Sequence, residues 1–356
     1  MAGSLCGFLI CDKPAGMTSR DVVNRVWGWI NRGRTKGQRV KVGHAGTLDP
    51  IATGVLVVSV GSATRLMSAI GDLVKAYDAT FELGCESVSG DIETRRQVRD
   101  DLPMPSIQTL SKASESFRGW IEQTPPTYSA IHVDGRRAYE RARAGESFEI
   151  PRRNVWLGNV QVTAFEAPRM AISITCGGGT YVRSVGIDLA AKCGQVAMMT
   201  QLRRTRVGPF SLDHAVDLRD ASWQHPSRER VVACLRPMHE ATAHLPSVVL
   251  NGEQIRRVID GQTLAWESIR WIPPAVDACQ VPGGARVAGS AEASDHAGST
   301  CGGDTHGKWI AMMDSAGELV GLASRDWGAK DSVSGRSENR HSVLTPRKVL
   351  RAHAQQ

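Results

Sequence analysis

The segment that most constrains this chain is KVGHAGTLDPIATGVLVVSVG, residues 41–61. It joins a glycine-rich turn to an aliphatic run that has the length of a strand buried on both faces. Asp49 lies at the junction, where Pro50 disfavours a helical conformation for it. Gly46 and Gly54 permit the backbone turns that would project the Asp49 carboxylate from the strand end. The segment therefore predicts either a functional carboxylate or an aspartate that caps its own turn.

Hydrophobic periodicity elsewhere predicts strands and helices around one sheet. Residues 7–14 read as a buried strand, and residues 77–83 alternate apolar and polar side chains as a half-buried strand does. Residues 17–30 begin with a capping box and continue with apolar residues at helical spacing. Residues 169–175 alternate again and lead through three glycines into a further helix. We interpret residues 1–240 as one domain.

A separate unit is predicted from residue 245 onward. Residues 308–323 read as a hairpin with its turn near residue 315. Residues 273–306 are rich in Pro, Gly, Ala and Ser and are predicted to be a disordered insertion. The last segment, 327–356, holds six basic and two acidic residues with few apolar ones, and is predicted to be a disordered basic tail.

Composition excludes several classes of protein. The chain has 356 residues, of which 41% are hydrophobic and 22% charged, as in soluble globular proteins. It has no apolar run of about 20 residues and no signal-peptide pattern, so a cytoplasmic protein is predicted. The eight cysteines form no C-x-x-C pair, which favours reduced thiols over a zinc site or disulfides. Motifs for a P-loop, a zinc protease and a nucleophile elbow are absent.

The net charge of +7 is unevenly distributed. No acidic residue occurs between residues 22 and 48, and two further basic groups follow later in the chain. A single run of this kind is usually a solvated face, but three runs beside unusual loops favour a polyanionic partner. The groups are Arg25, Arg32, Arg34, Lys36, Arg39 and Lys41; Arg136, Arg137, Arg141 and Arg143; and Arg203, Arg204 and Arg206.

Residues 177–183, GGGTYVR, form a second candidate site. The glycines permit close backbone approach after a strand, and Tyr181 and Arg183 alternate to one face. A hairpin corner with an aromatic anchor would show the same pattern. Together with Asp49 and Tyr77, these side chains would form a pocket for a flat, polar ligand such as a nucleobase. The residues alone favour an RNA-facing pocket with a single acid and do not identify the reaction.

Four ordered segments resemble the TruB family of tRNA pseudouridine synthases: GHAGTLDPIATGVL, KAYDATFELG, QTPPTYSAIHVDGRRAYERARAG, and GTYVRSVGIDLAAKCG followed by LRRTRVGPF. The resemblance covers residues 7–210 and extends weakly through 245–326. It implies an α+β fold: a pseudouridine synthase catalytic domain over 1–240 with a mixed, mainly antiparallel sheet flanked by helices. It also implies an RNA-gripping arm at 124–153 and a small C-terminal PUA-like β domain, which the insertion would interrupt.

The resemblance implies isomerisation of uridine 55 in the T-loop (TΨC arm) of tRNA to pseudouridine, by base flipping and an aspartate-dependent exchange of the glycosidic bond. It also implies a monomeric, cytoplasmic enzyme without cofactor, metal, guide RNA or obligate protein partner. A tRNA-folding chaperone without essential catalysis is the alternative, and retention of Asp49, Arg183 and Tyr77 argues against it. A guide-RNA-dependent synthase is a third reading, which the bacterial-style arm disfavours.

Three residues match the family's catalytic set. Asp49 falls on the catalytic aspartate, which acts on the target nucleotide as the glycosidic bond breaks. Arg183 matches the arginine that pairs with this carboxylate. Tyr77 matches the tyrosine that stacks on the flipped uracil, close enough to take part in proton transfer.

Other positions match substrate-binding residues or depart from them. Tyr181 and Leu202 match residues that line the base pocket, and His44 matches the histidine inserted into the T-loop where the base has left. The sequence departs from the family pattern in two places: at 87–89, where Ser-Val-Ser replaces the common Thr-Asp-Thr, and at His132. Val88 stands where an aspartate is common, so an acidic contact is expected to be lost. His132 replaces a lysine of the arm, which weakens a phosphate contact.

Overall fold

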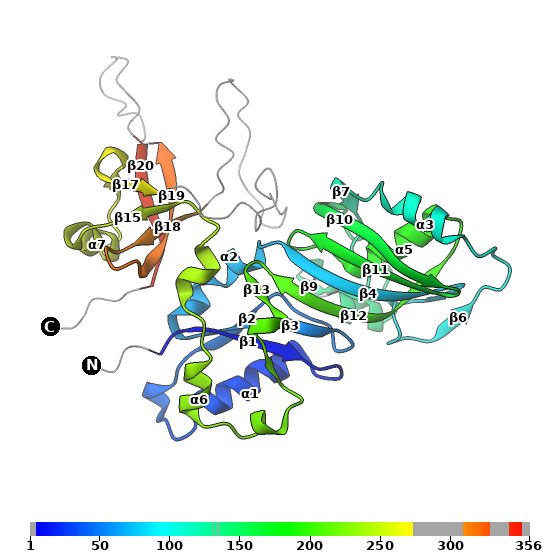
Figure 1. The fold of residues 1–356 in the computed structure, drawn as a ribbon, viewed down its shortest axis with the longest axis horizontal. Helices are drawn as coiled ribbons and strands as arrows, with labels where there is room; N and C mark the ends of the chain where they lie inside the picture. Colours follow the sequence, from blue (N-terminus) through cyan, green and yellow to red (C-terminus); the bar gives the residue numbers. More distant parts are fainter. Residues whose placement is uncertain (1–4, 130, 134, 273–308, 328–341, 351–356) are drawn as a thin grey trace, which may run out of the picture.

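The computed structural model describes residues 5–129, 131–133, 135–272, 309–327 and 342–350. These residues form a ten-stranded sheet, a six-stranded sheet and two small two-stranded sheets (Figure 1). The predicted disordered insertion at 273–306 lies outside the described residues. No helix in the described ranges is long and apolar enough to cross a membrane.

The ten-stranded sheet is mixed and mainly antiparallel, as predicted. Only β1 with β14 and β3 with β12 pair in parallel. Two short strands lie outside the main strand order: β2 pairs with β3, and β13 pairs with β12. The path runs β14 (Val216–Asp217), β1 (Gly7–Lys13), β3 (Thr53–Val60), β12 (Ala197–Val207), β4 (Lys75–Leu83), β11 (Arg169–Cys176), β10 (Arg153–Glu166) and β7 (Gly119–Gln123), with β2 at Val42–Ala45 and β13 at Phe210–Ser211.

The contact between β3 and β12 joins the two halves of this sheet and positions the site. It is short: the recorded register pairs only Arg203 with Thr53 and Arg204 with Gly54. β1, β2 and β14 lie on one side of this junction, and β4, β11, β10 and β7 lie on the other. The loop that carries Asp49 connects β2 to β3, so it ends at the junction.

Helix α1 (Ser19–Asn31) forms where the pattern predicts it. The Thr18 side chain accepts a hydrogen bond from the Asp21 amide, and the Asp21 carboxylate accepts one from the Thr18 amide, which completes the predicted capping box. The other helices of this domain are α2 (Met67–Gly71), α3 (Ile107–Ser114), α4 (Ala138–Arg143), α5 (Val182–Lys192) and α6 (Arg228–Ala233), with short 3₁₀ segments at Lys36–Gln38, Gly61–Leu66, Leu212–His214, Ala221–Trp223 and Met238–Thr242.

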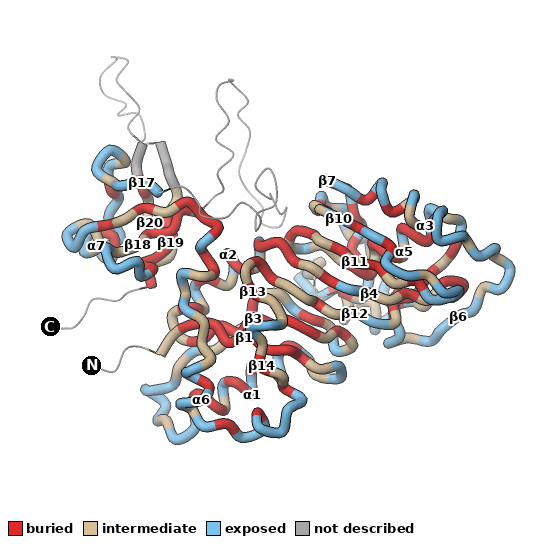
Figure 2. The backbone as a smooth tube through the Cα atoms, viewed as in Figure 1, coloured by how far each residue is buried: buried red, intermediate tan, exposed pale blue. Residues whose placement is uncertain are grey.

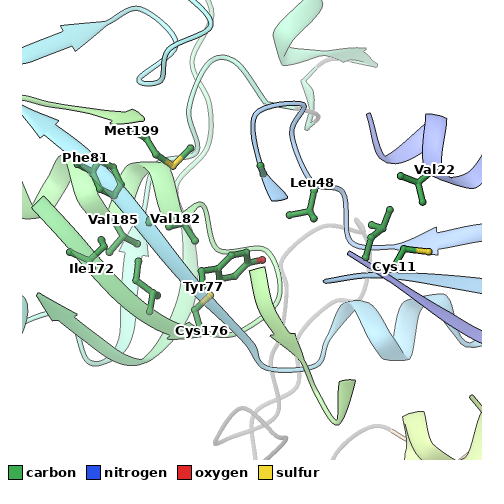
Figure 3. Packing of buried hydrophobic residues seen from close by; sticks show 14 of the residues in the cluster. Cys11, Val22, Leu48, Tyr77, Phe81, Ile172, Cys176, Val182, Val185 and Met199 are labelled. Carbon is green, nitrogen blue, oxygen red and sulfur yellow. The ribbon is translucent and has the colours of Figure 1, made fainter. Parts of the chain in front are cut away.

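Helix α5 packs directly on β4. Tyr77 and Phe81 of β4 share one hydrophobic cluster with Val182 and Val185 of α5 (Figure 3). A Cβ atom at Gly186 would come within 2.1 Å of the Phe81 ring, so only glycine permits this close approach. The first turn of α5, which carries Arg183, is thereby fixed against the strand that carries Tyr77.

Two small hairpins lie between β4 and β10 along the chain. One pairs β5 (Cys85–Ser87) with β6 (Arg96–Val98), and the other, within the predicted arm, pairs β8 (His132–Val133) with β9 (Arg136–Arg137). The arm helix predicted over 136–144 is present as α4. The described cysteines are all free thiols.

The C-terminal domain is a six-stranded sheet beside helix α7 (Gly252–Ile259), consistent with the PUA-like expectation. The predicted hairpin is confirmed, because Asp314 and Gly317 close the turn between β18 and β19. The strand order is β16 (Leu264–Ala265), β20 (Ser342–Val349), β19 (Leu319–Trp327), β18 (Ile310–Met313), β15 (Ser247–Val249) and β17 (Arg270–Ile272), with a 3₁₀ segment at Trp266–Ser268.

The prediction of a disordered tail over 327–356 is wrong for β20. This strand pairs with β19 on one side and with β16 on the other, so it lies inside the sheet. Leu344 is fully buried and Leu350 nearly so. The prediction was based on the low apolar content of all thirty residues. That average does not reveal a short strand whose few apolar residues are buried.

The C-terminal domain is packed against the ten-stranded sheet. Ala311, Leu322 and Leu350 belong to the same hydrophobic cluster as Phe8 and Val57 of β1 and β3. Figure 2 shows buried backbone along the central strands of both sheets, with exposed segments at α6, α7 and β6. The two domains therefore share a continuous core.

Candidate active site

The Asp49 loop is held by two residues from the N-terminal segment. The Ser19 hydroxyl accepts a hydrogen bond from the Leu48 amide at 2.8 Å and donates one to the Leu48 carbonyl at 3.0 Å. The Lys13 ammonium group donates to the carbonyls of Met17 and Pro50. Burial lowers the pKa of Lys13 to about 8. Because these bonds fix the backbone on both sides of Asp49, the carboxylate projects from a rigid loop.

Arg204 holds the same loop from the opposite half of the sheet. Its side chain is 1% exposed and donates hydrogen bonds to the carbonyls of Gly46 and Val55. Gly54 has a φ of +100°, and a Cβ there would lie 2.1 Å from the Arg204 carbonyl oxygen. Glycine is therefore required at this position, as the sequence predicts.

A buried arginine joins two carboxylates at the site. Arg183, whose side chain is 6% exposed, places Nη2 3.1 Å from Asp49 Oδ2 and Nη1 3.0 Å from Asp91 Oδ2. The Asp91 side chain is 2% exposed, whereas that of Asp49 is 45% exposed. The predicted pairing of Arg183 with Asp49 is confirmed, and Asp49 is the carboxylate that an incoming ligand can reach.

Tyr77 lies in the hydrophobic core of the catalytic domain. The residue is 7% exposed, and Figure 3 shows its ring beside Cys176 and Val182. Burial raises the pKa of Tyr77, although the positive charge of Arg204 opposes the shift. The hydroxyl therefore keeps its proton near neutral pH, and the ring offers little surface to solvent.

Tyr181 is positioned by residues at the base of the arm. Its amide donates to Gln123 Oε1 at 2.8 Å, and Gln123 Nε2 donates back to its carbonyl at 3.0 Å. The Arg153 guanidinium lies 4.8 Å from the centre of the Tyr181 ring. Gln123 directly precedes the arm at 124–153 and Arg153 is its last residue, so Tyr181 contacts both ends of the segment predicted to grip RNA.

A cleft of about 680 Å³ borders the site. Leu202 lines it together with Pro50 and Ile51, which directly follow Asp49. Asp78 and Arg203 add charged groups to its wall. The cleft is within the size range of small-ligand sites, and the place of Leu202 beside a bound base stays a prediction.

His44 lies on β2, one strand from the junction, and is partly buried. Burial, followed by the charges of Arg20 and Arg204, lowers the pKa of His44. The imidazole is therefore neutral near pH 7, and its Nδ1 atom has no partner among the described residues. A neutral ring on this strand suits insertion between bases better than a phosphate contact.

The basic groups differ in what they do. Arg204 is a buried structural residue, so the prediction that it faces a polyanion is wrong. Arg203 forms an ion pair with Asp12 at 2.8 Å, and its side chain stays 35% exposed. In the arm, Arg136 and Arg141 both pair with Glu146. The partner of Arg203 could not be read from local charge density, because Asp12 lies 191 residues away.

The first basic group, at residues 25–41, contains exposed side chains that RNA could reach. Arg32, Lys36 and Lys41 are exposed and form no ion pair within the part of the chain that the structure describes. Arg39 lies over the partly exposed Trp27 ring at 5.4 Å. This basic loop, residues 32–41, leads directly into β2 and His44.

The two departures from the family pattern have different surroundings. Val88 is 68% exposed, so it makes no buried contact at the site. The buried acidic group there is Asp91, three residues later, which sequence reasoning missed. His132 is exposed on β8 of the arm.

Five supporting residues escaped sequence reasoning. Lys13 was the most visible, because it ends a fully buried strand in which Asp12 is the other charged residue. The others lie in ordinary contexts, and only their three-dimensional partners reveal them. The five are Lys13, Ser19, Asp91, Gln123 and Arg204.

Comparison with solved structures identifies the class of fold. The chain matches the structure titled "Crystal Structure of a Cbf5-Nop10-Gar1 Complex" with a TM-score of 0.66 over 97% of this chain and 85% of that one, at 24% identity. A second match, the archaeal box H/ACA sRNP Nop10-Cbf5 complex, has a TM-score of 0.63 over 98% and 87% of the two chains, at 22% identity. This chain therefore has the fold of the chains matched in these Cbf5 complexes.

Sequence comparison identifies the family. The model of the TruB family pseudouridylate synthase N-terminal domain matches residues 34–182, and that of the tRNA pseudouridylate synthase B C-terminal domain matches residues 183–243. A tRNA pseudouridine synthase B of Rhodopirellula baltica is 43% identical over 70% of this chain and 72% of its own. One of Thermobifida fusca is 40% identical over 73% and 86%. The chain belongs to the TruB family and is a tRNA pseudouridine synthase.

Proposed function

We propose that this enzyme isomerises uridine 55 in the T-loop of tRNA to pseudouridine. It acts as a cytoplasmic monomer, without a cofactor, a guide RNA or a protein partner. The observation that carries the proposal is the Asp49 carboxylate, half-exposed on a rigid loop and paired with the buried Arg183. The curated relatives, which bear the name tRNA pseudouridine synthase B, support the choice of substrate.

The reaction breaks the N1–C1′ bond of uridine, turns the base, and forms a C5–C1′ bond. The proton lost from C5 is balanced by one gained at N1, so no oxidant or reductant is consumed. A carboxylate is a suitable group to act at C1′ or on the sugar while the base is detached. Arg183 holds one oxygen of Asp49, which leaves the other free to face the nucleotide.

The surrounding residues suit a flipped pyrimidine. Leu202 lines the cleft beside the Asp49 loop, and Tyr77, on the strand that also carries the cleft residue Asp78, keeps its hydroxyl proton. Tyr181, held by Gln123, is the aromatic ring that we expect to contact the base from the side of the arm. A base withdrawn from its stack would exchange stacking on RNA for contact with these side chains.

The direct test incubates the purified protein alone with an unmodified tRNA transcript and maps pseudouridine at single-nucleotide resolution. Modification of uridine 55 without any added component supports the proposal. Modification elsewhere, or only after guide RNA or other proteins are added, would contradict it.

The basic loop at 32–41 fits a role in binding the phosphate backbone. Neutralising it with Arg32→Gln, Lys36→Gln and Lys41→Gln is expected to raise KM about tenfold at 0.15 M salt and to leave kcat unchanged. The logarithmic salt dependence of the dissociation constant should lose slope, because fewer counterions are released.

The matched control removes three exposed arginines that already have acidic partners, through Arg96→Gln, Arg99→Gln and Arg219→Gln. We expect this variant to bind tRNA as the wild type does. An equal rise of KM in both variants would mean that net charge, and not this loop, determines affinity.

His44→Ala is expected to slow modification of intact tRNA more than modification of a substrate whose T-loop base is already unstacked. The neutral imidazole is proposed to stabilise the flipped RNA and not to touch the breaking bond. Single-turnover rates on the two substrates measure the difference. Equal slowing on both would place His44 in the chemical step.

A further inference from the structure

The loop at 87–94 contains a buried group of hydroxyls directed at Asp91. Ser89, which is 2% exposed, places its Oγ 2.6 Å from Asp91 Oδ1 and 2.7 Å from Thr94 Oγ1. The Ser89 amide donates to Thr94 Oγ1, and the Glu93 amide donates to Asp91 Oδ1. Asp91 Oδ1 is therefore held by one hydroxyl and one backbone amide.

The single hydroxyl proton of Ser89 has one favoured acceptor. A carboxylate oxygen at 2.6 Å forms a charge-assisted hydrogen bond, which is stronger than a bond to a neutral hydroxyl or to the Asp91 backbone carbonyl at 3.2 Å. Ser89 therefore donates to Asp91, and the Thr94 hydroxyl donates to Ser89. The three groups form a directional chain that ends on the carboxylate.

Asp91 connects these hydroxyl groups to Arg183, and Arg183 binds Asp49. Its second oxygen, Oδ2, binds Nη1 of Arg183, while Nη2 of Arg183 binds Asp49 Oδ2. The Arg183 Nη1 group also donates to the Ser89 backbone carbonyl. Arg183 Nε has no partner among the described residues, so the guanidinium is oriented through its two Nη groups.

We propose that Ser89 is a positioning residue for the reaction. By fixing Asp91 on Nη1, it stops Arg183 from turning both Nη groups onto Asp49. Asp49 then keeps one oxygen, Oδ1, which has no hydrogen-bond partner in the described part of the chain and can face the substrate. Ser89 itself is buried beneath Asp91 and does not touch RNA. The inference rests on the proposed role of Asp49.

The test compares Ser89→Ala with Ser87→Ala. The Ser87 hydroxyl donates to the Asp91 backbone carbonyl at 2.6 Å and not to the carboxylate, so its loss removes an equally short bond from the same loop. We expect Ser89→Ala to lower kcat about tenfold or more with KM unchanged, and Ser87→Ala to stay within about twofold of the wild type. Ser89→Thr, which keeps the hydroxyl, should restore most of kcat.

A second measurement does not depend on activity. Nitrogen-15 NMR should show slow rotation of the Arg183 guanidinium in the wild type and in Ser87→Ala, and fast rotation in Ser89→Ala. Unchanged rotation in Ser89→Ala, equal losses of kcat in the two alanine variants, or a Ser89→Thr variant as slow as Ser89→Ala would each overturn the proposal. An inactive wild type in which rotation still depends on Ser89 would instead refute the proposed function alone.

Discussion

Asp49→Asn is expected to reduce pseudouridine formation below detection while leaving the protein folded and able to bind tRNA. The substitution keeps the size of the side chain and removes its charge and nucleophilicity. Arg183 keeps its ion pair with Asp91, so the buried guanidinium is not left without a counter-charge. The 45% exposure of the Asp49 side chain makes a neutral amide tolerable there.

RNA affinity should change by no more than about tenfold, or roughly 1.4 kcal/mol, because it depends on phosphate contacts and base stacking. Filter binding and thermal unfolding, measured beside the modification assay, separate the possible outcomes. Appreciable conversion of uridine 55 by the variant would refute the aspartate-dependent mechanism. Loss of tRNA binding would show that Asp49 has a structural role.

Truncation after Trp327 is expected to unfold the C-terminal sheet. The deletion removes β20, which pairs with two neighbours, and exposes the edge of β19. It also removes Leu344 and Leu350 from two hydrophobic clusters. Replacing one buried leucine by alanine typically costs about 2–5 kcal/mol, which is a large part of the 5–15 kcal/mol that stabilises a typical domain.

Calorimetry and limited proteolysis of the truncated protein test this expectation, with Leu344→Ala as the milder variant. The sequence alone predicts the opposite result, in which the tail is dispensable and its loss only lowers the salt dependence of RNA binding. If the truncated protein melts at the same temperature as the full chain, the tail is dispensable for folding and our expectation is wrong.

The features that could be predicted from the sequence depend on residues close to one another along the chain. The capping box of α1, the strand at 77–83 and the hairpin around residue 315 depend on neighbours within a few residues, and all are present. The Asp49 loop was recognisable because its glycines are required locally. Asp91 and Arg204 were missed or misread because their partners come from distant segments, which no local pattern encodes.

The Asp49 loop also has a consequence for synthesis of the chain. The ribosome synthesises the residues that hold this loop at very different times. Ser19 lies 29 residues from its partner in the loop, Arg183 lies 134 residues from Asp49, and Arg204 lies 158 residues from Gly46. Contacts of such long range form late in folding, and a nascent chain cannot make them before residue 204 has left the ribosome. An incomplete chain therefore presents its early cationic loop to cellular RNA well before it can modify any of it.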